Sequence, residues 1–219
     1  YAKLPYNVFT DLAPGSVAVI NPQILVLHPS VPANSVKELI ALAKSRPGQI
    51  NYATASNGSP NNLAGELLNQ MAGIQLTHIA YKYAPQATTD TIAGHVQSAM
   101  ASLTSVLPHV RNGKLKALGT TGPRRSALAP EVPAIAETVP GYQANIWNGL
   151  IAPGATPRAI ITRLNSIAVQ QLKLPEMRER FAGLGAEALT STPQEFDAFI
   201  RAEMVKWEKV IHAAGIQTN

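Results

Sequence analysis

The chain has 219 residues, of which 46% are hydrophobic and only 14% are charged. This length and apolar content suffice for one large domain or two small ones with buried cores, which excludes an intrinsically disordered chain. There is no cysteine, which excludes disulfides, thiolate metal sites and a cysteine nucleophile. No apolar run reaches the roughly 20 residues of a membrane-spanning helix. No signal peptide is visible, so an exported protein would be represented here by a processed or truncated form.

The formal net charge is +5, and it is spread along the chain. The densest basic stretch lies between His109 and Arg125. It has no interleaved aromatic residues and no nucleic-acid-binding motif, so we interpret it as an ordinary solvated surface. A mild positive charge of this kind would still attract an anionic solute.

Strand and helix patterns alternate through the first 120 residues. Residues 17–28 are rich in β-formers, but Pro22 cannot donate to a ladder, so we expect the strand to bend or change domain there. Residues 35–38 form a capping box that opens a helix to about Ser45. The pattern then predicts strands at 50–53, 76–80, 96–101 and 115–120 and helices at 62–72, 86–93 and 105–111. This alternation predicts an α/β fold with largely parallel strands, in which Pro108 is tolerable only in the first turn of its helix.

The chain becomes mainly helical after a surface excursion at 122–141 and a strand at 143–152. Thr156 and Pro157 are predicted to be the N-cap and first residue of a helix, and residues 192–195 combine the same device with a capping box. The last helix carries an apolar stripe made by Phe196, Phe199, Ile200, Met204, Trp207 and Ile211. These helices need a sheet to cover. We therefore expect them either to pack on the preceding domain or to leave part of the stripe exposed or covered by self-association.

Several phrases of the sequence resemble one family along essentially the whole chain. They are KLPYNVFTDLAPGSVAV, HPSVPANSVKELIALAKSRPGQINYA, LPHVRNGKLKALGTTGPRRS, VPAIAETVPGY, GLIAPGATP and TPQEFDAFIRAEMVKW. The family is that of the substrate-binding proteins of tripartite tricarboxylate transporters, also called the Bug or TctC-like family.

The resemblance implies a two-lobe α/β fold with a hinge, similar to type II periplasmic binding proteins. Lobe two is expected at 22–149 and nearly complete, and lobe one is expected as a remnant at 1–21 and 150–219. The rest of lobe one, with another ligand-gripping loop, is expected to precede this chain.

The resemblance also implies an extracytoplasmic receptor in the periplasm that captures a small di- or tricarboxylate or related organic acid. It would close around its ligand by hinge motion and deliver it to the membrane permease subunits of the transporter. The complete protein is expected to be a monomer that needs no cofactor and binds no nucleic acid.

The first candidate ligand-binding segment is the loop at 55–62, which joins a strand to a helix. Backbone N–H groups at a helix start are unpaired, and the helix dipole favours an anion there. Gly58 permits unusual backbone angles, and the neighbouring side chains can donate hydrogen bonds. The candidate residues in this loop are Ser56, Asn57, Gly58, Ser59, Asn61 and Asn62. The alternative is a plain strand–helix turn in which Ser59 or Asn61 merely caps; the resemblance favours the ligand loop.

The second and third candidates follow the next two strands. The second candidate segment precedes a helix and contains Tyr81, Tyr83 and Ala84. The resembling family usually has glycine where this chain has Tyr83, so the ligand specificity of the family does not transfer directly to this chain. Half-buried packing is the alternative for both tyrosines. Ala101 and Ser102 lie at the end of another strand, where many relatives have Asp or Asn, so an acid without an amino group is favoured.

Trp147 lies near the expected return crossing between lobes and is either a hinge wall that contacts ligand or, the favoured interpretation, a core residue. The five histidines lie far apart in sequence, without the spacing of metal ligands: His28, His78, His95, His109 and His212. We therefore expect no metal site.

Three other functions remain open. An unrecognised α/β enzyme would lack the nucleophile-elbow, zincin, P-loop and dinucleotide motifs, none of which occurs here. A regulatory effector domain would require a neighbouring helix-turn-helix, which this chain does not contain. A solute-binding sensor component for signalling has no sequence feature that separates it from a transport receptor.

Overall fold

The computed structural model describes residues 4–216, which fall into two compact units. Unit 1 combines the segment that ends at Asn21 with Trp147–Lys209, and unit 2 combines Pro22–Ile146 with Val210–Ile216. Residues 1–3 and 217–219, which the sequence assigns to lobe one, lie outside the described residues. Each unit is described by itself.

Unit 2 is built on a five-stranded sheet in the order β4-β3-β5-β2-β6. Its strands are β2 (Gln23–Leu27), β3 (Ile50–Thr54), β4 (Leu76–Ala80), β5 (Ser98–Ser102) and β6 (Lys116–Thr120). Strand β3 pairs in parallel with β4 and β5, and β2 runs antiparallel to both β5 and β6. Strands β3, β4 and β5 therefore end at the same edge of the sheet.

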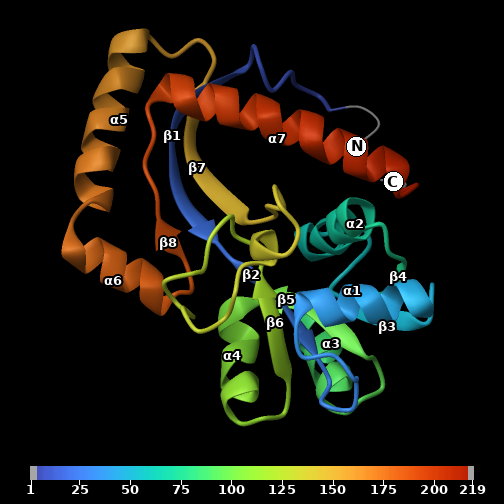
Figure 1. Cartoon of the computed structure of the whole chain (residues 1–219). Coiled ribbons are helices and arrows are strands. Elements are labelled where there is room, and N and C mark those ends of the chain that lie inside the picture. The colour runs from blue at the N-terminus through green and yellow to red at the C-terminus, as the bar shows by residue number, and fades with distance from the viewer. Residues whose placement is uncertain (1–3, 217–219) are drawn as a thin grey trace. The chain divides into compact units, whose positions relative to one another are not determined.

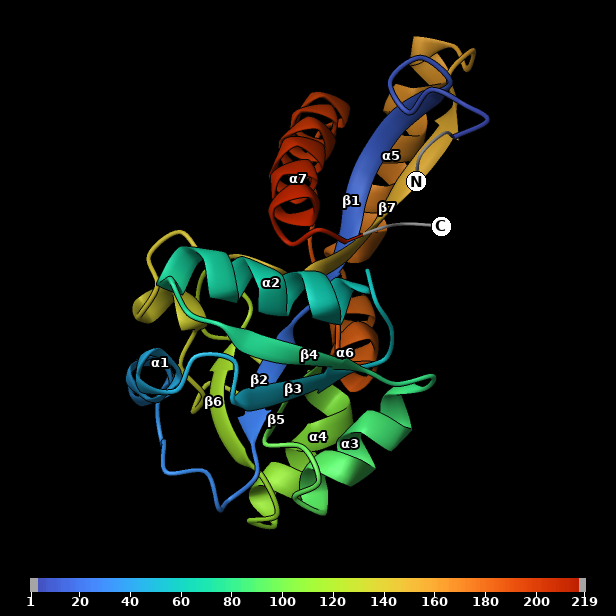
Figure 2. The same cartoon turned by 90° about the vertical axis from the view of Figure 1, so that its right-hand side faces the viewer.

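Helices cover both faces of this sheet. They are α1 (Val36–Ser45), α2 (Pro60–Ala72), α3 (Ala84–Ile92) and α4 (Leu103–Arg111), followed by the short 3-10 helix η1 (Ile135–Glu137). Helices α1 and α2 lie on one face, and α3 and α4 lie on the other (Figure 2). All five residues of β2 are buried, as expected for a strand with helices on both sides. The α/β class predicted from the alternating pattern is confirmed.

The break at Pro22 is also confirmed. Strand β1 (Leu12–Asn21) ends one residue before this proline and β2 begins one residue after it, in a different sheet. The proline thus separates the strand of unit 1 from the strand of unit 2.

Four helix starts differ from the prediction: α2, α3 and α4 begin two residues early, and α5 begins one residue late. Helix α4 begins at Leu103, so Pro108 lies inside the helix instead of in its first turn. The proline removes only the N–H that would donate to the Thr104 carbonyl, while the helix buries Leu103, Val106 and Leu107. Helix α5 (Arg158–Leu172) begins one residue after Pro157, which is its N-cap and makes no side-chain cap.

Unit 1 contains a three-stranded sheet in the order β7-β1-β8. It adds β8 (Glu187–Ala188), α6 (Pro175–Gly183), β7 (Ile146–Pro153) from Trp147 onward and α7 (Pro193–Ala213) as far as Lys209. Helix α5 packs along β1 (Figure 1). Helix α7 begins with the predicted capping box: the Glu195 N–H donates to Thr192 Oγ1 at 3.1 Å and the Thr192 N–H to Glu195 Oε2 at 2.8 Å.

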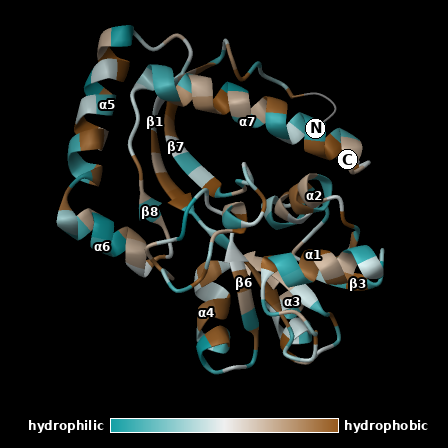
Figure 3. Cartoon of the chain, viewed as in Figure 1, coloured by the Kyte–Doolittle hydropathy of each residue, from teal (hydrophilic) through white to brown (hydrophobic). Residues whose placement is uncertain are grey.

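The apolar stripe of α7 is only partly covered. Phe196 and Ile200 are buried with Val17, whereas Met204 is 42% exposed. Hydrophobic and hydrophilic residues alternate along α5 (Figure 3), where Ile160 and Ile167 are also exposed. The expectation that part of the stripe lies exposed in this chain therefore agrees with the structure. Among residues 4–216, no helix has both the length and the apolar character needed to cross a membrane.

Candidate functional site

Three helices begin at one edge of the unit 2 sheet. Helices α2, α3 and α4 follow β3, β4 and β5, and these strands are parallel. Helix starts carry unpaired N–H groups and the positive end of the helix dipole. The carboxyl edge of such a sheet is where open α/β folds place their ligands.

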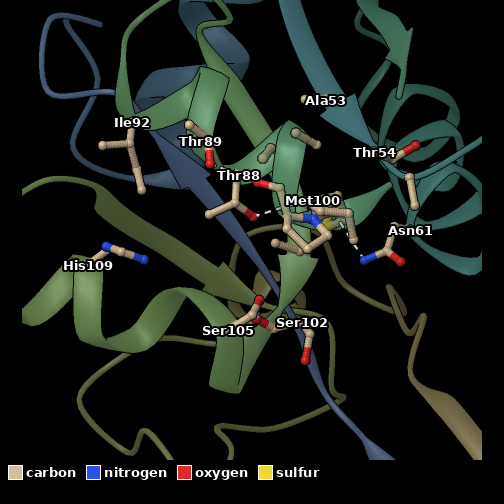
Figure 4. Close-up of a pocket in the computed structure, with 16 residues that line it drawn as sticks. Ala53, Thr54, Asn61, Thr88, Thr89, Ile92, Met100, Ser102, Ser105 and His109 are labelled. Atoms are coloured by element: carbon tan, nitrogen blue, oxygen red, sulfur yellow. Dashed lines mark hydrogen bonds between the residues drawn. The ribbon is translucent and has the colours of Figure 1, made fainter. Parts of the chain in front are cut away.

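An open cavity of about 390 Å³ lies at this edge and extends between α3 and α4. Sixteen residues line it: Ala53, Thr54, Ala55, Asn61, Ala84, Pro85, Ala87, Thr88, Thr89, Ile92, Ala99, Met100, Ala101, Ser102, Ser105 and His109 (Figure 4). Nine of them are apolar and six are neutral polar residues, so hydrogen bonds and not ion pairs would fix a bound solute.

The starts of α3 and α4 are not closed by side chains. Tyr83 and Ser102 occupy the N-cap positions, and neither makes a side-chain cap. Ala84, Pro85, Ser102 and Ser105 bring both starts to the wall of the cavity. The N–H groups of Ala84 and Gln86 in α3 and of Thr104 and Ser105 in α4 are therefore available to an acceptor inside it. Pro85 has no N–H, and the Leu103 N–H donates to the Pro22 carbonyl at 3.4 Å.

The start of α2 is different, because its own side chains occupy it. Ser59 Oγ accepts from the Asn62 N–H at 3.3 Å, and Asn62 Oδ1 accepts from the Gly58 N–H at 2.9 Å. Asn62 Nδ2 in turn donates to the Tyr52 hydroxyl at 2.8 Å. Gly58 adopts a φ of 70°, the left-handed conformation that glycine permits. Its amide, expected to be a free donor, is thus already used.

A buried polar network lies below this loop. The Tyr52 hydroxyl donates to Glu66 Oε1 at 2.5 Å, and burial raises the pKa of Tyr52 far above its ordinary value. A Cβ at Gly65 would lie 2.3 Å from the Tyr52 ring, so only glycine leaves room for it. Thr54 Oγ1 lies 2.6 Å from His78 Nε2, and burial lowers the pKa of His78. The network holds the loop and β3 together and leaves Thr54 at the cavity wall.

Four of the predicted ligand-binding residues line the cavity, namely Asn61, Ala84, Ala101 and Ser102. Asn61 Nδ2 donates to the Met100 carbonyl at 3.1 Å, which fixes the amide side chain at the rim. The other predicted residues are not in the lining: Ser56, Asn57, Gly58, Ser59, Asn62, Tyr81, Tyr83 and Trp147.

The two tyrosines serve different purposes. The Tyr81 hydroxyl donates to Asp90 Oδ2 at 2.9 Å, its ring packs against the buried core, and burial raises its pKa. Tyr83 is 60% exposed, with the Lys82 ammonium 5.4 Å from its ring centroid. Tyr81 thus fits the packing alternative, whereas Tyr83 stands exposed at the first residue before α3.

Trp147 is a packing residue of unit 1. Its indole N–H donates to Glu203 Oε2 at 3.2 Å, and its ring makes edge contacts with Phe196 and Phe199. The Trp207 indole donates to the same carboxylate oxygen at 2.9 Å. These contacts agree with the core interpretation of Trp147.

The sequence reasoning missed the part of the cavity formed by the bodies of α3 and α4. The missed residues on these helices are Thr88, Thr89, Ile92, Ser105 and His109, and Thr54 at the end of β3 was missed as well. Ser105 and His109 are four residues apart, and so are Thr88 and Ile92, the spacing of one helix face. That periodicity was the available signal. Within residues 4–216 no cluster of three potential metal ligands is present.

Comparison with known proteins gives consistent matches. The profile of the TctC family, described as the tripartite tricarboxylate transporter family receptor, matches residues 1–216. Protein BugT of Bordetella pertussis is 34% identical over 214 residues, which cover 97% of this chain and 66% of BugT. Three curated relatives are matched over 63–66% of their own length, so the chain spans slightly less than two thirds of them.

Solved structures agree with these matches. Rpa4515 of R. palustris, solved with adipate, has a TM-score of 0.79 and 32% identity and is aligned over 99% of this chain and 73% of its own. MatC from Rhodopseudomonas palustris, solved with malate, has a TM-score of 0.73 and 27% identity and is aligned over 95% of this chain and 72% of its own. The family is described as one of receptors, and another solved neighbour, BugD, which is 27% identical, is described as a periplasmic binding protein. The family match over residues 1–216, together with the agreement in fold, shows that the chain belongs to the family of tripartite tricarboxylate transporter receptors.

Proposed function

We propose that this protein is a periplasmic receptor that captures a small organic acid for the permease of a tripartite tricarboxylate-type transporter. The observation that carries the proposal is the cavity at the carboxyl edge of the unit 2 sheet, where α3 and α4 begin without side-chain caps. An anion is the natural ligand of such unpaired N–H groups. The adipate and malate in the two solved relatives are acids and support the same class of ligand.

In this proposal the ligand carboxylate accepts hydrogen bonds from the free first-turn amides of α3 and α4 and from the Ser102 hydroxyl. The Ser105 hydroxyl already donates to the Ser102 carbonyl at 2.8 Å. Charge-assisted hydrogen bonds contribute roughly 1.5–3 kcal/mol each, so a few of them suffice for micromolar binding, about 8 kcal/mol. Asn61 and Ala101 complete the wall. The loop at 56–59 and Asn62 act as scaffold, because their polar groups are bonded to each other.

We assign unit 2 to lobe two of the two-lobe fold and unit 1 to part of lobe one. Hinge closure would then exclude water from the bound acid and strengthen each hydrogen bond to it. The permease would recognise the closed form.

Isothermal titration of the purified protein, with whatever sequence flanks these residues in its gene, tests the proposal. Succinate, malate and adipate are compared with succinamide and adipamide, which keep the shape of two of the acids but carry no charge. We expect at least one acid to bind with micromolar affinity and its amide to bind at least a hundredfold more weakly. Equal affinity for an acid and its amide, or no binding by any acid to a folded sample, would contradict the proposal.

A further inference from the structure

The body of the cavity is built from small apolar side chains. Six of the sixteen lining residues are alanines: Ala53, Ala55, Ala84, Ala87, Ala99 and Ala101. Three of these, Ala53, Ala87 and Ala99, are at most 4% exposed, so they form the floor where the cavity meets the core. Any larger side chain there would occupy the space, and the alanines therefore create an apolar volume inside the unit.

The cavity is long in one direction. It follows α3 from Ala84 to Ile92, a distance of about 12 Å at 1.5 Å per residue. On the opposite wall it follows α4 from Ser105 to His109, one further turn from the helix start. Figure 4 shows Ile92 and His109 at one end and Asn61 with Thr54 at the other. The two uncapped helix starts thus serve one end of an elongated space.

The cavity wall carries very little charge. Among the described residues that line the cavity, none is Lys, Arg, Asp or Glu, and His109 is the one titratable side chain. A compact tricarboxylate would place carboxylates against alanine and isoleucine side chains, where an unpaired charge is costly. An acid with a charge at one end and an apolar stem fits better, because its carboxylate would meet the backbone donors and its stem would contact the alanines.

We propose, building on the function proposed above, that this cavity selects elongated acids with an apolar stem over compact polycarboxylates. The carboxylate lies at the starts of α3 and α4, and the stem lies over Ala87 and Ala99, along the length of about 12 Å that α3 spans from Ala84 to Ile92. The far end of the ligand lies between Ile92 and His109. Ile92 and His109 therefore limit the length of the ligand that the cavity accepts.

The first test is a titration series of linear acids, butanoate, hexanoate and octanoate, together with citrate. Burial of each methylene should raise the affinity about threefold to fourfold, and hexanoate should bind at least tenfold more tightly than citrate. An affinity that does not change with chain length, or tightest binding by citrate, would overturn the inference and leave the proposed function intact. Absence of binding by every acid would overturn both.

The second test blocks the length of the cavity. Thr89 is exposed and lines the cavity, and Ala93 is exposed at the end of α3 and lies outside the lining, so both positions tolerate a large side chain. Thr89→Trp should lower the affinity for octanoate at least tenfold and change that for butanoate less than twofold. The matched Ala93→Trp should change neither. A folded Thr89→Trp protein that binds octanoate as tightly as the unchanged protein would overturn the inference.

Discussion

Unit 2 contains two kinds of helix start at the same edge of its sheet. The start of α2 is surrounded by polar side chains, but Ser59, Asn62 and Gly58 bond to one another and leave the loop closed. The starts of α3 and α4 have no side-chain cap. The Ser105 hydroxyl at the start of α4 bonds to the Ser102 carbonyl and leaves the first-turn amides of Thr104 and Ser105 unpaired. The difference shows that polar residues near a helix start can stabilise the loop, while the helices without caps keep their backbone donors for a ligand.

The largest expected effect comes from a charge at an open start. Ala84→Glu should lower the affinity for organic acids at least a hundredfold, because its carboxylate would occupy the donors of α3 and repel the ligand. Ala84→Gln, which has the same size without the charge, should change the affinity less than tenfold. Titration of both variants with the acid that binds most tightly gives the comparison. Equal losses in the two variants would show that size and not charge matters at this position.

A substitution that disturbs the closed start of α2 should lower the stability of the protein. Gly65→Ala places a Cβ against the Tyr52 ring and should lower the free energy of unfolding by about 1–3 kcal/mol. Gly183→Ala is the control, since a Cβ there meets nothing within 4 Å, and it should be neutral or slightly stabilising. Urea unfolding measures both. A Gly65→Ala protein as stable as the control would show that the Tyr52 ring is free to move away.

The Asn62→Ala variant tests whether Asn62 stabilises the loop at the start of α2 or binds the ligand. Loss of its buried hydrogen bonds should destabilise the protein by about 1–3 kcal/mol, whereas the exposed Asn57→Ala should have little effect. We expect the affinity of folded Asn62→Ala for acids to stay within about fivefold of the original. A much larger loss of affinity, with the protein still folded, would move the ligand to the start of α2.

The smallest expected effect is a dependence of stability on pH. Burial lowers the pKa of His78 below its ordinary value of 6.5, and the Glu66 carboxylate offsets part of that shift. The unfolded chain therefore takes up a proton near pH 6.5 before the folded protein does, so stability is full above this pH and falls as the pH is lowered through it. His78→Gln should flatten the curve between pH 7 and pH 5. An unchanged slope in this variant would assign the acid sensitivity to other groups.

Much of the fold was predictable from the sequence, whereas several helix starts were not. The helices with capping boxes, α1 and α7, start where their Ser35 and Thr192 caps predicted. Helices α2, α3 and α4 all start two residues earlier than predicted, at Pro60, Ala84 and Leu103, although Ser59 caps α2. Helices α3 and α4 have no side-chain cap, so the pattern contained no start signal at the two places where backbone donors remain free.

The candidate site was less predictable than the fold. The polar loop at 55–62 was predicted to bind ligand because side-chain donors are visible in a sequence. The donors of α3 and α4 belong to the backbone, and their wall consists of alanines whose importance depends on the space around them. Ala87 and Ala99 form the floor of the cavity only because α3 and α4 pack on β3 and β5.

Amide chemical shifts measured by NMR during titration with an organic acid test the central claim most directly. The account predicts that the amides of Ala84, Gln86, Thr104 and Ser105 shift strongly on binding, while those of Gly58 and Asn62 stay nearly unchanged. Strong shifts confined to Gly58, Asn61 and Asn62, with the starts of α3 and α4 unaffected, would contradict it.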